Sequence, residues 1–231
     1  MKNKKKIIII SVVVVIGLIA AYYIGLYLYR HHKIVDVKRA EVTNVDKIKT
    51  DKKGIVVYFT RVGNSNFDED VEAVSSASLM LADGELAGNS EVLAEMICNA
   101  TGYESYAIKT VKKYPSTYEE TCAVARTEML QEEDIEIEEV PDMSEYDTVI
   151  MVYPIWWSTI PEAVKVFYKN TDLEGKTLYS LVTHGGSKFG ATISDTKKYT
   201  KANVSDNNLV VFDKDVVNAK EDVENWIKTM E

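Results

Sequence analysis

Cysteine and histidine are scarce in this chain, whose 231 residues include two cysteines and three histidines. No Cys-x-x-Cys pair and no Cys/His cluster occurs, so the sequence argues against a structural zinc or iron–sulfur site, and we predict no metal ligands. Cys98 lies in an apolar stretch with helical periodicity and is expected to be a small core residue. The sequence does not decide whether Cys122 lies close enough to bond with it.

Basic residues are also in short supply outside the N-terminal region. Residues 1–39 hold eight of the 27 Lys and Arg and one of the 36 Asp and Glu, which leaves 19 bases against 35 acids, a net charge of −16, on the rest of the chain. Such a domain lacks the positive face that nucleic acids require, so no nucleic-acid partner is predicted. The charge permits electrostatic steering toward a basic protein partner, or it serves only to keep the domain soluble.

The longest apolar run lies near the N-terminus. Ile7 to Tyr29 contains no charged residue and follows a short lysine-rich tail. At about 1.5 Å per residue it is long enough to span a bilayer core of roughly 30 Å. We therefore expect residues 1–29 to form a basic tail and an uncleaved single-pass transmembrane anchor, with a cleaved signal peptide as the rival interpretation. A short basic tail that stays inside favours an extracytoplasmic soluble domain.

The remaining chain predicts a charged stalk over residues 30–52 and a single domain over residues 53–231. Apolar, β-branched runs predict strands at 54–59, 105–110, 147–153, 177–183 and 209–212. Helices are predicted between and after them, at 90–100, 118–131, 161–168, 189–199 and 216–230. This alternation predicts an α/β fold, a doubly wound five-stranded parallel sheet with order 2-1-3-4-5. Residues 65–87 form an insertion, either a lid loop or an inert excursion.

The turn after the third predicted strand carries two adjacent tryptophans, Trp156 and Trp157, directly behind Pro154 and Ile155. Proline ends the strand pairing and the chain must turn there. Two neighbouring indoles in a turn cannot both point into the core, so one of them is expected to face a crevice. A flat aromatic side chain at the carboxyl end of a strand suits stacking on a planar ligand. The alternative is that both rings fill space beneath a neighbouring helix.

Two further turns fall at the same edge of the predicted sheet. The first strand ends in Thr60-Arg61-Val62-Gly63-Asn64, and the chain enters its helix at Gly88-Asn89-Ser90. Small and polar residues there allow a helix N-terminus to bind an anion, although Asn89 or Ser90 also suits a plain N-cap. The fourth strand ends in Thr183-His184-Gly185-Gly186. Glycines permit close approach of the backbone to a ligand, and the histidine is either a hydrogen-bond donor to it or a structural residue.

Taken in order, these motifs resemble the flavodoxin-like family of FMN-binding proteins over about residues 54–230. The resemblance rests on Tyr58–Asn64, Gly88–Ile97, Lys112–Tyr118, Tyr153–Pro161 and Thr183–Gly190. It implies non-covalently bound FMN, with phosphate at the first turn and the isoalloxazine ring between the second and third. The cofactor-binding residues that it implies are Thr60, Arg61, Gly63, Asn64, Asn89, Ser90, Pro154, Ile155, Trp156, Trp157, Thr183, His184, Gly185 and Gly186. Because the insertion splits the phosphate loop, either Asn64 or Asn89 can be the asparagine that meets phosphate.

The function that the resemblance implies is that of an FMN-dependent redox protein. No side chain is identified as an essential acid, base or nucleophile, so no catalytic residue is predicted and electron transfer to a redox partner protein is favoured. A flavin-dependent reductase of quinones or similar acceptors is the second hypothesis. The third is a flavin-free interaction domain that keeps the fold without the ligand, because fold alone does not fix function.

Overall fold

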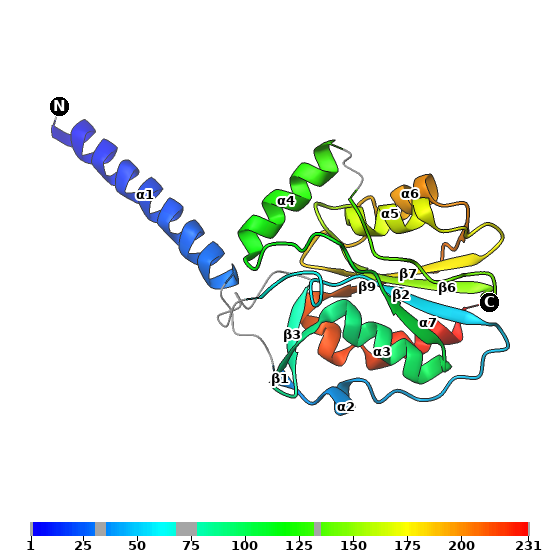
Figure 1. Cartoon of the computed structure of the whole chain (residues 1–231). Helices are drawn as coiled ribbons and strands as arrows, with labels where there is room; N and C mark the ends of the chain where they lie inside the picture. The colour runs from blue at the N-terminus through cyan, green and yellow to red at the C-terminus, as the bar shows by residue number, and fades with distance from the viewer. Residues whose placement is uncertain (1, 31–35, 68–77, 132–134, 231) are drawn as a thin grey trace. The chain divides into compact units, whose positions relative to one another are not determined.

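The computed structural model describes residues 2–30, 36–67, 78–131 and 135–230 (Figure 1). The chain divides into two compact units, Met1–Lys33 and Ile34–Glu231. The first unit consists of one helix, α1 (Lys2–Arg30). The second contains all the strands and the remaining helices of the described chain.

The prediction of a membrane anchor concerns the residues that form helix α1, and the structure does not bear it out. Within the described ranges, no helix combines the length and the apolar character that crossing a bilayer requires. The predicted transmembrane helix is therefore wrong, and so is the predicted localisation to a membrane with an extracytoplasmic domain.

Parallel strands form the main sheet of the second unit. In the described chain they are β2 (Gly54–Tyr58), β5 (Glu104–Ala107), β6 (Thr148–Pro154), β7 (Thr177–His184), β8 (Asn203–Val204) and β9 (Leu209–Phe212). The sheet order is β5-β2-β6-β7, and both β8 and β9 pair with β7, at successive registers. Together β8 and β9 act as one interrupted edge strand, so the strands follow the predicted order 2-1-3-4-5. The order reverses between β2 and β6, which is where such sheets bind ligands.

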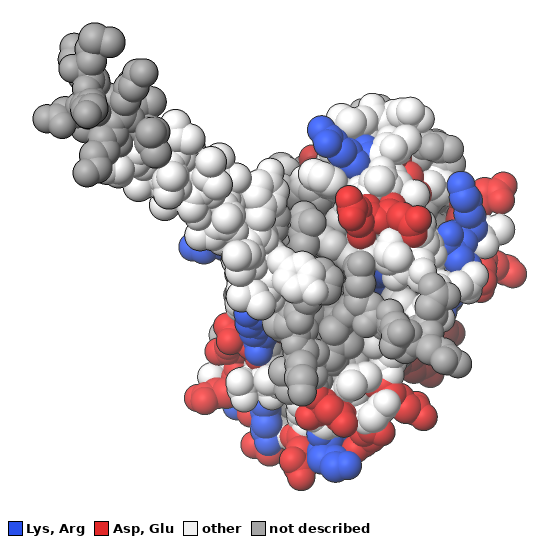
Figure 2. Space-filling model, turned by 90° about the vertical axis from the view of Figure 1, so that its left-hand side faces the viewer, with Lys and Arg blue, Asp and Glu red and all other residues white. Residues whose placement is uncertain are grey.

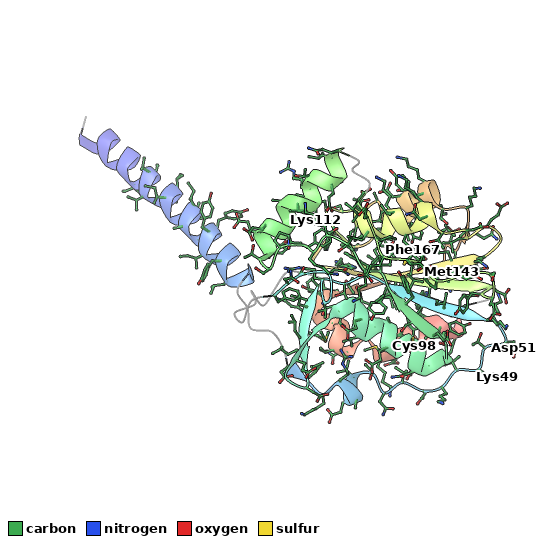
Figure 3. The ribbon with its side chains drawn as sticks, viewed as in Figure 1. Lys49, Asp51, Cys98, Lys112, Met143 and Phe167 are labelled. Carbon is green, nitrogen blue, oxygen red and sulfur yellow. The ribbon has the colours of Figure 1, made fainter. Side chains whose placement is uncertain are left out.

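Helices cover both faces of the sheet, as Figure 1 shows. One face packs against α3 (Asn89–Thr101) and α7 (Lys220–Lys228), and the other against α5 (Glu162–Asn170) and α6 (Thr192–Tyr199). Side chains of β2 alternate between the two cores, with Val56 on the α3 side and Ile55 on the α5 side. Because both faces are covered, the central strands are apolar throughout, which is why their sequences read as continuous hydrophobic runs. Figure 3 labels Met143 and Phe167, two members of the α5-side core.

Both cysteines are free thiols. Cys98 lies on α3, partly buried against the core beneath it (Figure 3), and burial raises the pKa of its thiol to about 11. This is the environment expected of a small core residue. Cys122 lies on α4 (Tyr118–Gln131), in the wall of the cavity described below.

The predicted stalk and part of the insertion together build a second, smaller sheet. β1 (Asp36–Val37) pairs with β3 (Leu79–Ala82), which forms a hairpin with β4 (Glu85–Gly88). A short helix, α2 (Arg39–Val42), follows β1, and the chain then runs along α3, where the Ile48 amide donates to the Ala100 carbonyl at 2.8 Å. Residues 36–52 are thus packed against the domain. Of the insertion, residues 68–77 lie outside the described residues.

Candidate functional site

Turns at the carboxyl ends of β2, β6 and β7 line one cavity, with a volume of about 260 Å³. Of the predicted site residues, the wall includes Arg61, Ile155, Trp156, Trp157, Gly185 and Gly186. The same wall contains residues that were not among the predicted site residues: Ser78, Tyr118, Thr121, Cys122, Ala125, Ser158 and Ser187. The topology therefore brings the second and third predicted turns and part of the first to one place.

The tryptophan turn has an unusual backbone. Trp157 and Ser158 both adopt left-handed conformations, with φ of 48° and 63°. The turn is closed by reciprocal backbone hydrogen bonds between Trp156 and Thr159, of 3.1 and 2.9 Å. A left-handed residue other than glycine costs on the order of 1–3 kcal/mol, and such residues cluster at ligand-binding sites. The turn therefore holds the Trp157 backbone in a left-handed conformation, which a residue with a bulky side chain adopts only when the surrounding structure enforces it.

The two tryptophans have different surroundings. The Trp156 ring is packed edge-to-face against Phe59, at 5.3 Å between ring centroids, and against Tyr114, at 5.1 Å. The Trp157 residue is 46% exposed, and its Nε1 donates to the Cys122 carbonyl oxygen at 3.0 Å. The guanidinium of Arg126 lies 5.2 Å from the Trp157 ring centroid. Trp156 is therefore anchored in an aromatic cluster, and Trp157 is the ring with a face left for a ligand.

Asn89 and Ser90, at the N-terminus of α3, are buried polar residues with unsatisfied side-chain atoms. They are 2% and 1% exposed, and among the described residues neither Asn89 Oδ1 nor Ser90 Oγ has a hydrogen-bond partner. The first backbone N–H groups of a helix also lack intrahelical partners, and the helix dipole places partial positive charge there. The Ser90 hydroxyl and the N–H groups of the first helical turn can donate to an anionic group, so the start of α3 fits an anion, whereas Asn89 Oδ1 can only accept.

Thr60 and Gly88 bring the end of β2 against the start of α3. A Cβ atom on Gly88 would overlap the Thr60 side chain, so the two segments approach more closely than any other residue at position 88 allows. The Asn89 amide donates to the Ser78 carbonyl, at 2.9 Å, and Ser78 lies in the cavity wall. Thr60, Asn89 and Ser90 do not line the cavity themselves; Asn89 adjoins its wall through the bond to Ser78.

Arg61 is the basic residue among the described residues of the cavity wall. It is almost completely buried, 1% exposed, and its Nη2 donates to the Ser116 carbonyl at 2.8 Å. Its guanidinium also lies 5.1 Å from the Phe67 ring centroid. Arginine remains charged even when buried, so Arg61 adds fixed positive charge to the cavity wall.

The loop that follows β2 is held together by hydrogen bonds of Asn64 and Gly63. The Asn64 amide nitrogen donates to the carbonyls of Thr60 and Ile108, both at 2.8 Å, and its Oδ1 accepts from the Thr110 backbone N–H, also at 2.8 Å. Both donors of this amide are therefore used within the protein. Gly63 adopts φ of 80°, and its carbonyl accepts from Lys113 Nζ at 3.0 Å. Neither residue lines the cavity, and of the two candidate asparagines Asn89 is the one with an unsatisfied group.

Three predicted site residues stabilise the turns without lining the cavity: Pro154, Thr183 and His184. The Ile155 amide donates to the Thr183 carbonyl at 2.8 Å, and Pro154 pairs with Thr183 as the last residue of β6. His184 Nδ1 accepts from the Gly186 amide at 2.9 Å, and its ring packs edge-to-face on Phe212. Burial lowers the pKa of His184. The histidine therefore orients the Gly185-Gly186 turn, and these three residues are not part of the cavity wall.

The chemistry of the wall is that of a binding site. Among its described residues none is a carboxylate, a histidine or a lysine, and its ionisable groups are the Arg61 guanidinium, the Tyr118 hydroxyl and the Cys122 thiol. In the described ranges no group of three or more His, Cys, Asp and Glu could hold a metal ion. An aromatic face at one position and orphaned polar groups at another suit a planar ligand with an anionic tail.

The wall residues that were absent from the predicted site come mainly from α4. Tyr118, Thr121, Cys122 and Ala125 stand at positions i, i+3, i+4 and i+7, so they share one face of the helix. That spacing was available in the sequence, but nothing in the sequence indicated that this face covers the mouth of the cavity.

Comparison with known proteins gives a family and a set of similar folds. The family model described as flavodoxin matches residues 78–230. A candidate flavoprotein from Bacteroides uniformis ATCC 8492 is 21% identical, with a TM-score of 0.56, over 78% of this chain and 100% of that one. A second, from Bacteroides eggerthii DSM 20697, is 23% identical, with a TM-score of 0.53, over 76% and 99%.

A third solved structure is that of a flavoprotein in complex with FMN from Lactobacillus acidophilus NCFM. It is 18% identical, with a TM-score of 0.49, over 72% of this chain and 97% of that one. Among curated proteins no significant match was found. At these identities the two Bacteroides structures bear on the fold alone.

Proposed function

The chain belongs to the flavodoxin family, and from that premise we propose that it binds FMN non-covalently and works as an electron-transfer protein. The observation that supports this best is the cavity at the carboxyl ends of β2, β6 and β7, with the half-exposed ring of Trp157 in its wall. Ligands of doubly wound sheets bind at this position, and a flavin ring is a planar heteroaromatic that stacks on indole.

The residues present fit the two ends of FMN. Thr60, Asn89 and Ser90 would hold the phosphate, because hydroxyl donors of Thr60 and Ser90 and the backbone N–H groups at the start of α3 come together there. Trp157 would hold the ring on one side, and Gly185 and Gly186 in the same wall would let the backbone approach it closely. FMN, when bound, supplies reversible redox chemistry through its isoalloxazine ring. The role of this chain's own residues is to bind FMN, orient it and shield it from solvent.

The lining of the cavity supports electron transfer over catalysis on a bound substrate. Acid–base catalysis requires a titratable side chain within hydrogen-bonding reach of the reacting group. The described wall offers neither carboxylate nor imidazole, and Arg61 does not deprotonate in proteins. A carrier needs only a bound flavin with one accessible edge, which this wall can provide.

A redox partner with a basic surface is the partner that we propose. Residues 40–231 carry 19 bases and 35 acids. On the face shown in Figure 2, acidic side chains lie among basic ones with no large basic patch. A net negative surface accelerates encounter with a positive partner at low ionic strength. Electron transfer to a candidate partner should therefore slow as salt is raised.

Purification of the full chain tests the flavin. A yellow protein that releases FMN on denaturation, or a colourless one that takes up added FMN stoichiometrically, supports the proposal. Failure to take up FMN would sink it and would leave a flavin-free interaction domain as the better account. Steady reduction of a quinone with a nicotinamide donor, by the FMN-loaded chain alone, would identify a reductase instead of a carrier.

A further inference from the structure

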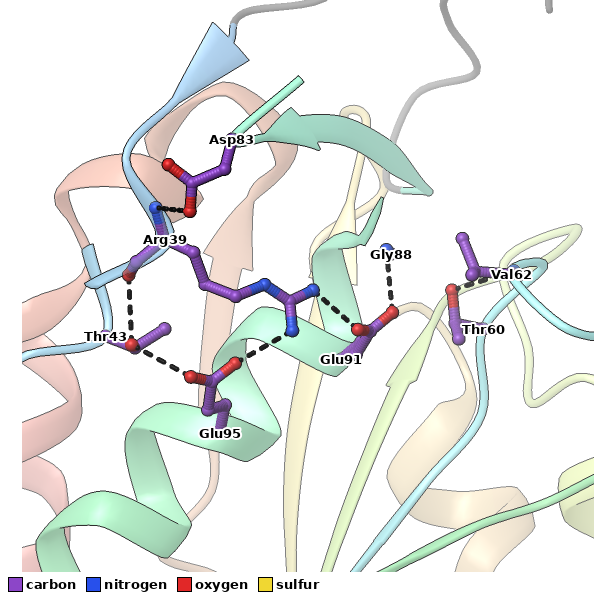
Figure 4. A network of polar contacts seen from close by, with 8 residues as sticks. All are labelled: Arg39, Thr43, Thr60, Val62, Asp83, Gly88, Glu91 and Glu95. Atoms are coloured by element: carbon purple, nitrogen blue, oxygen red, sulfur yellow. Dashed lines mark hydrogen bonds and ion pairs between the residues drawn. The ribbon is translucent and has the colours of Figure 1, made fainter. Parts of the chain in front are cut away.

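We infer that Arg39 is a positioning residue that makes the site select phosphorylated flavin. The inference rests on the proposed function, because it concerns the phosphate of FMN. Arg39 lies on α2, near the start of the second unit, and acts on the start of α3 through two glutamates. Figure 4 shows the contacts.

The guanidinium of Arg39 bridges two carboxylates on successive turns of α3. Its Nη2 donates to Glu91 Oε1 at 2.6 Å, and its Nη1 donates to Glu95 Oε2 at 3.1 Å. The other oxygen of Glu95 accepts from Thr43 Oγ1 at 3.1 Å. Burial works against the charged guanidinium, but the contacts with Glu91 and Glu95 outweigh it and raise the pKa of Arg39. A planar fork between two carboxylates is a geometry that lysine does not reproduce.

Glu91 connects this bridge to the phosphate end of the site. Its second oxygen, Oε2, accepts from the Gly88 backbone N–H at 3.2 Å, which is one half of a capping box, since Gly88 has no side chain to make the other half. Gly88 is the residue packed against Thr60, and it directly precedes Asn89 and Ser90 with their unsatisfied atoms. Arg39 therefore holds the carboxylate that fixes the first turn of α3, one residue away from the groups proposed to meet phosphate.

Electrostatics give Arg39 its second effect. Glu91 and Glu95 place two negative charges on the first turns of α3, where the proposed ligand brings a further anion. Like charges at such separations repel, and part-buried charges are screened less by salt than exposed ones. The side chains of Arg39, Glu91 and Glu95 are 34%, 23% and 33% exposed. The guanidinium offsets these carboxylates and leaves the helix N-terminus able to accept an anion.

The backbone keeps Arg39 in place independently of its side chain. Its amide donates to Asp83 Oδ2 at 3.3 Å, in the turn of the β3–β4 hairpin, and the Asp83 amide donates to the Val37 carbonyl at 2.8 Å. The Thr43 amide donates to the Arg39 carbonyl at 2.9 Å, which closes the turn of α2. Substitution of the side chain alone should therefore leave the segment in position and change the charge next to α3.

The test compares FMN with riboflavin, which has the same ring and no phosphate. Dissociation constants for both are measured by flavin fluorescence on the full chain, as wild type and as Arg39→Gln. We expect FMN to bind about three- to ten-fold more weakly to Arg39→Gln, while riboflavin changes less than about two-fold. Lys38→Gln is the matched control, since it removes the same charge from the neighbouring residue, whose 3.4 Å partner is the exposed Asp83. It should leave both ligands within about two-fold of wild type.

A second variant separates charge from folding. Arg39→Gln combined with Glu95→Gln removes the uncompensated carboxylate and should recover part of the lost FMN affinity. Equal loss of FMN and riboflavin in Arg39→Gln, or an effect of the same size in Lys38→Gln, would overturn the inference and leave Arg39 as an ordinary structural contact. A wild-type chain that binds neither flavin would overturn the proposed function itself, which is a different result from either of these.

Discussion

Replacement of Trp157 by alanine should weaken FMN binding by about 5- to 150-fold. The Trp157 ring has Arg126 at 5.2 Å from its centroid, so one face remains for a flavin. Stacking of a planar heterocycle on one aromatic side chain is worth roughly 1–3 kcal/mol by alanine substitution. At 1.4 kcal/mol for each factor of ten, this loss gives the stated range in the dissociation constant. Trp157→Phe keeps a ring but loses the bond from Nε1 to the Cys122 carbonyl, and should lie between wild type and Trp157→Ala.

The assay is titration of the apo full chain with FMN, followed by quenching of flavin fluorescence, with thermal unfolding of each apo variant alongside. Trp226→Phe is the control, because Trp226 is buried on α7, bonded to the Asn207 carbonyl, and absent from the cavity wall. It should leave the FMN dissociation constant unchanged even where it lowers stability. A Trp157→Ala constant within two-fold of wild type would refute the stacking assignment, and a large effect in Trp226→Phe would show that the assay reports folding instead of the site.

The remaining predictions concern packing and access. Trp156→Ala should lower the free energy of unfolding by about 3 kcal/mol or more in a denaturant titration, because it removes the centre of an aromatic cluster. Gly88→Ala should destabilise the chain and weaken FMN binding. Thr60→Ala in the same chain should restore part of the stability, since the added Cβ meets the Thr60 side chain, but not the FMN affinity, because Thr60 is itself proposed to hold the phosphate. Iodoacetamide at pH 8, followed by mass spectrometry, should leave Cys98 largely unmodified, because its thiol has a pKa of about 11 and stays protonated at that pH. Bound FMN should shield Cys122, which lines the cavity; equal labelling of Cys122 with and without FMN would contradict the site.

The sequence predicted the main sheet well because its strands are buried on both faces. β2 and β6 appear as uninterrupted apolar runs, and both strands lie within one residue of the predicted bounds. α4 begins and ends at the predicted residues. The edge of the sheet was harder, since the two-residue strand β8 is too short for any periodicity, and the predicted C-terminal helix opens with a 3₁₀ segment, Asp213–Asn218.

The small sheet shows what local patterns leave out. Its hairpin turns at Asp83-Gly84, both with positive φ, which is the pair that a two-residue turn favours. That dipeptide was present in the sequence as a hairpin signal. The pairing of β3 with β1 was not, because it joins residues more than forty positions apart and only two residues of β1 take part. Val45 of residues 36–52 nevertheless joins the core on the α3 side, and Val37, Val42 and Ile48 pack against that core.

The site was predictable where side-chain type fixes the role, and not where orientation does. Two tryptophans after a strand indicated an aromatic wall, but the division of roles between them follows from Phe59 and Tyr114, which a sequence does not place beside Trp156. His184 reads as a ligand contact by composition. In the structure its Nδ1 instead accepts a hydrogen bond from the backbone N–H of Gly186. That geometry is set by the register of β7 and β9.

The insertion splits the phosphate loop in sequence without separating it in space. Pairing of Leu79 with Gly88 fixes the end of the β3–β4 hairpin at the start of α3, whatever the length of chain before it. Gly88 then lies directly against the Thr60 side chain, which is possible because glycine has no Cβ atom. Asn64, with its amide bonded to Thr60 and Ile108, closes the first half of the loop on itself. The two halves are therefore built independently and meet at one glycine, so substitution at position 88 should disturb the anion end of the site more than changes of length within residues 68–77.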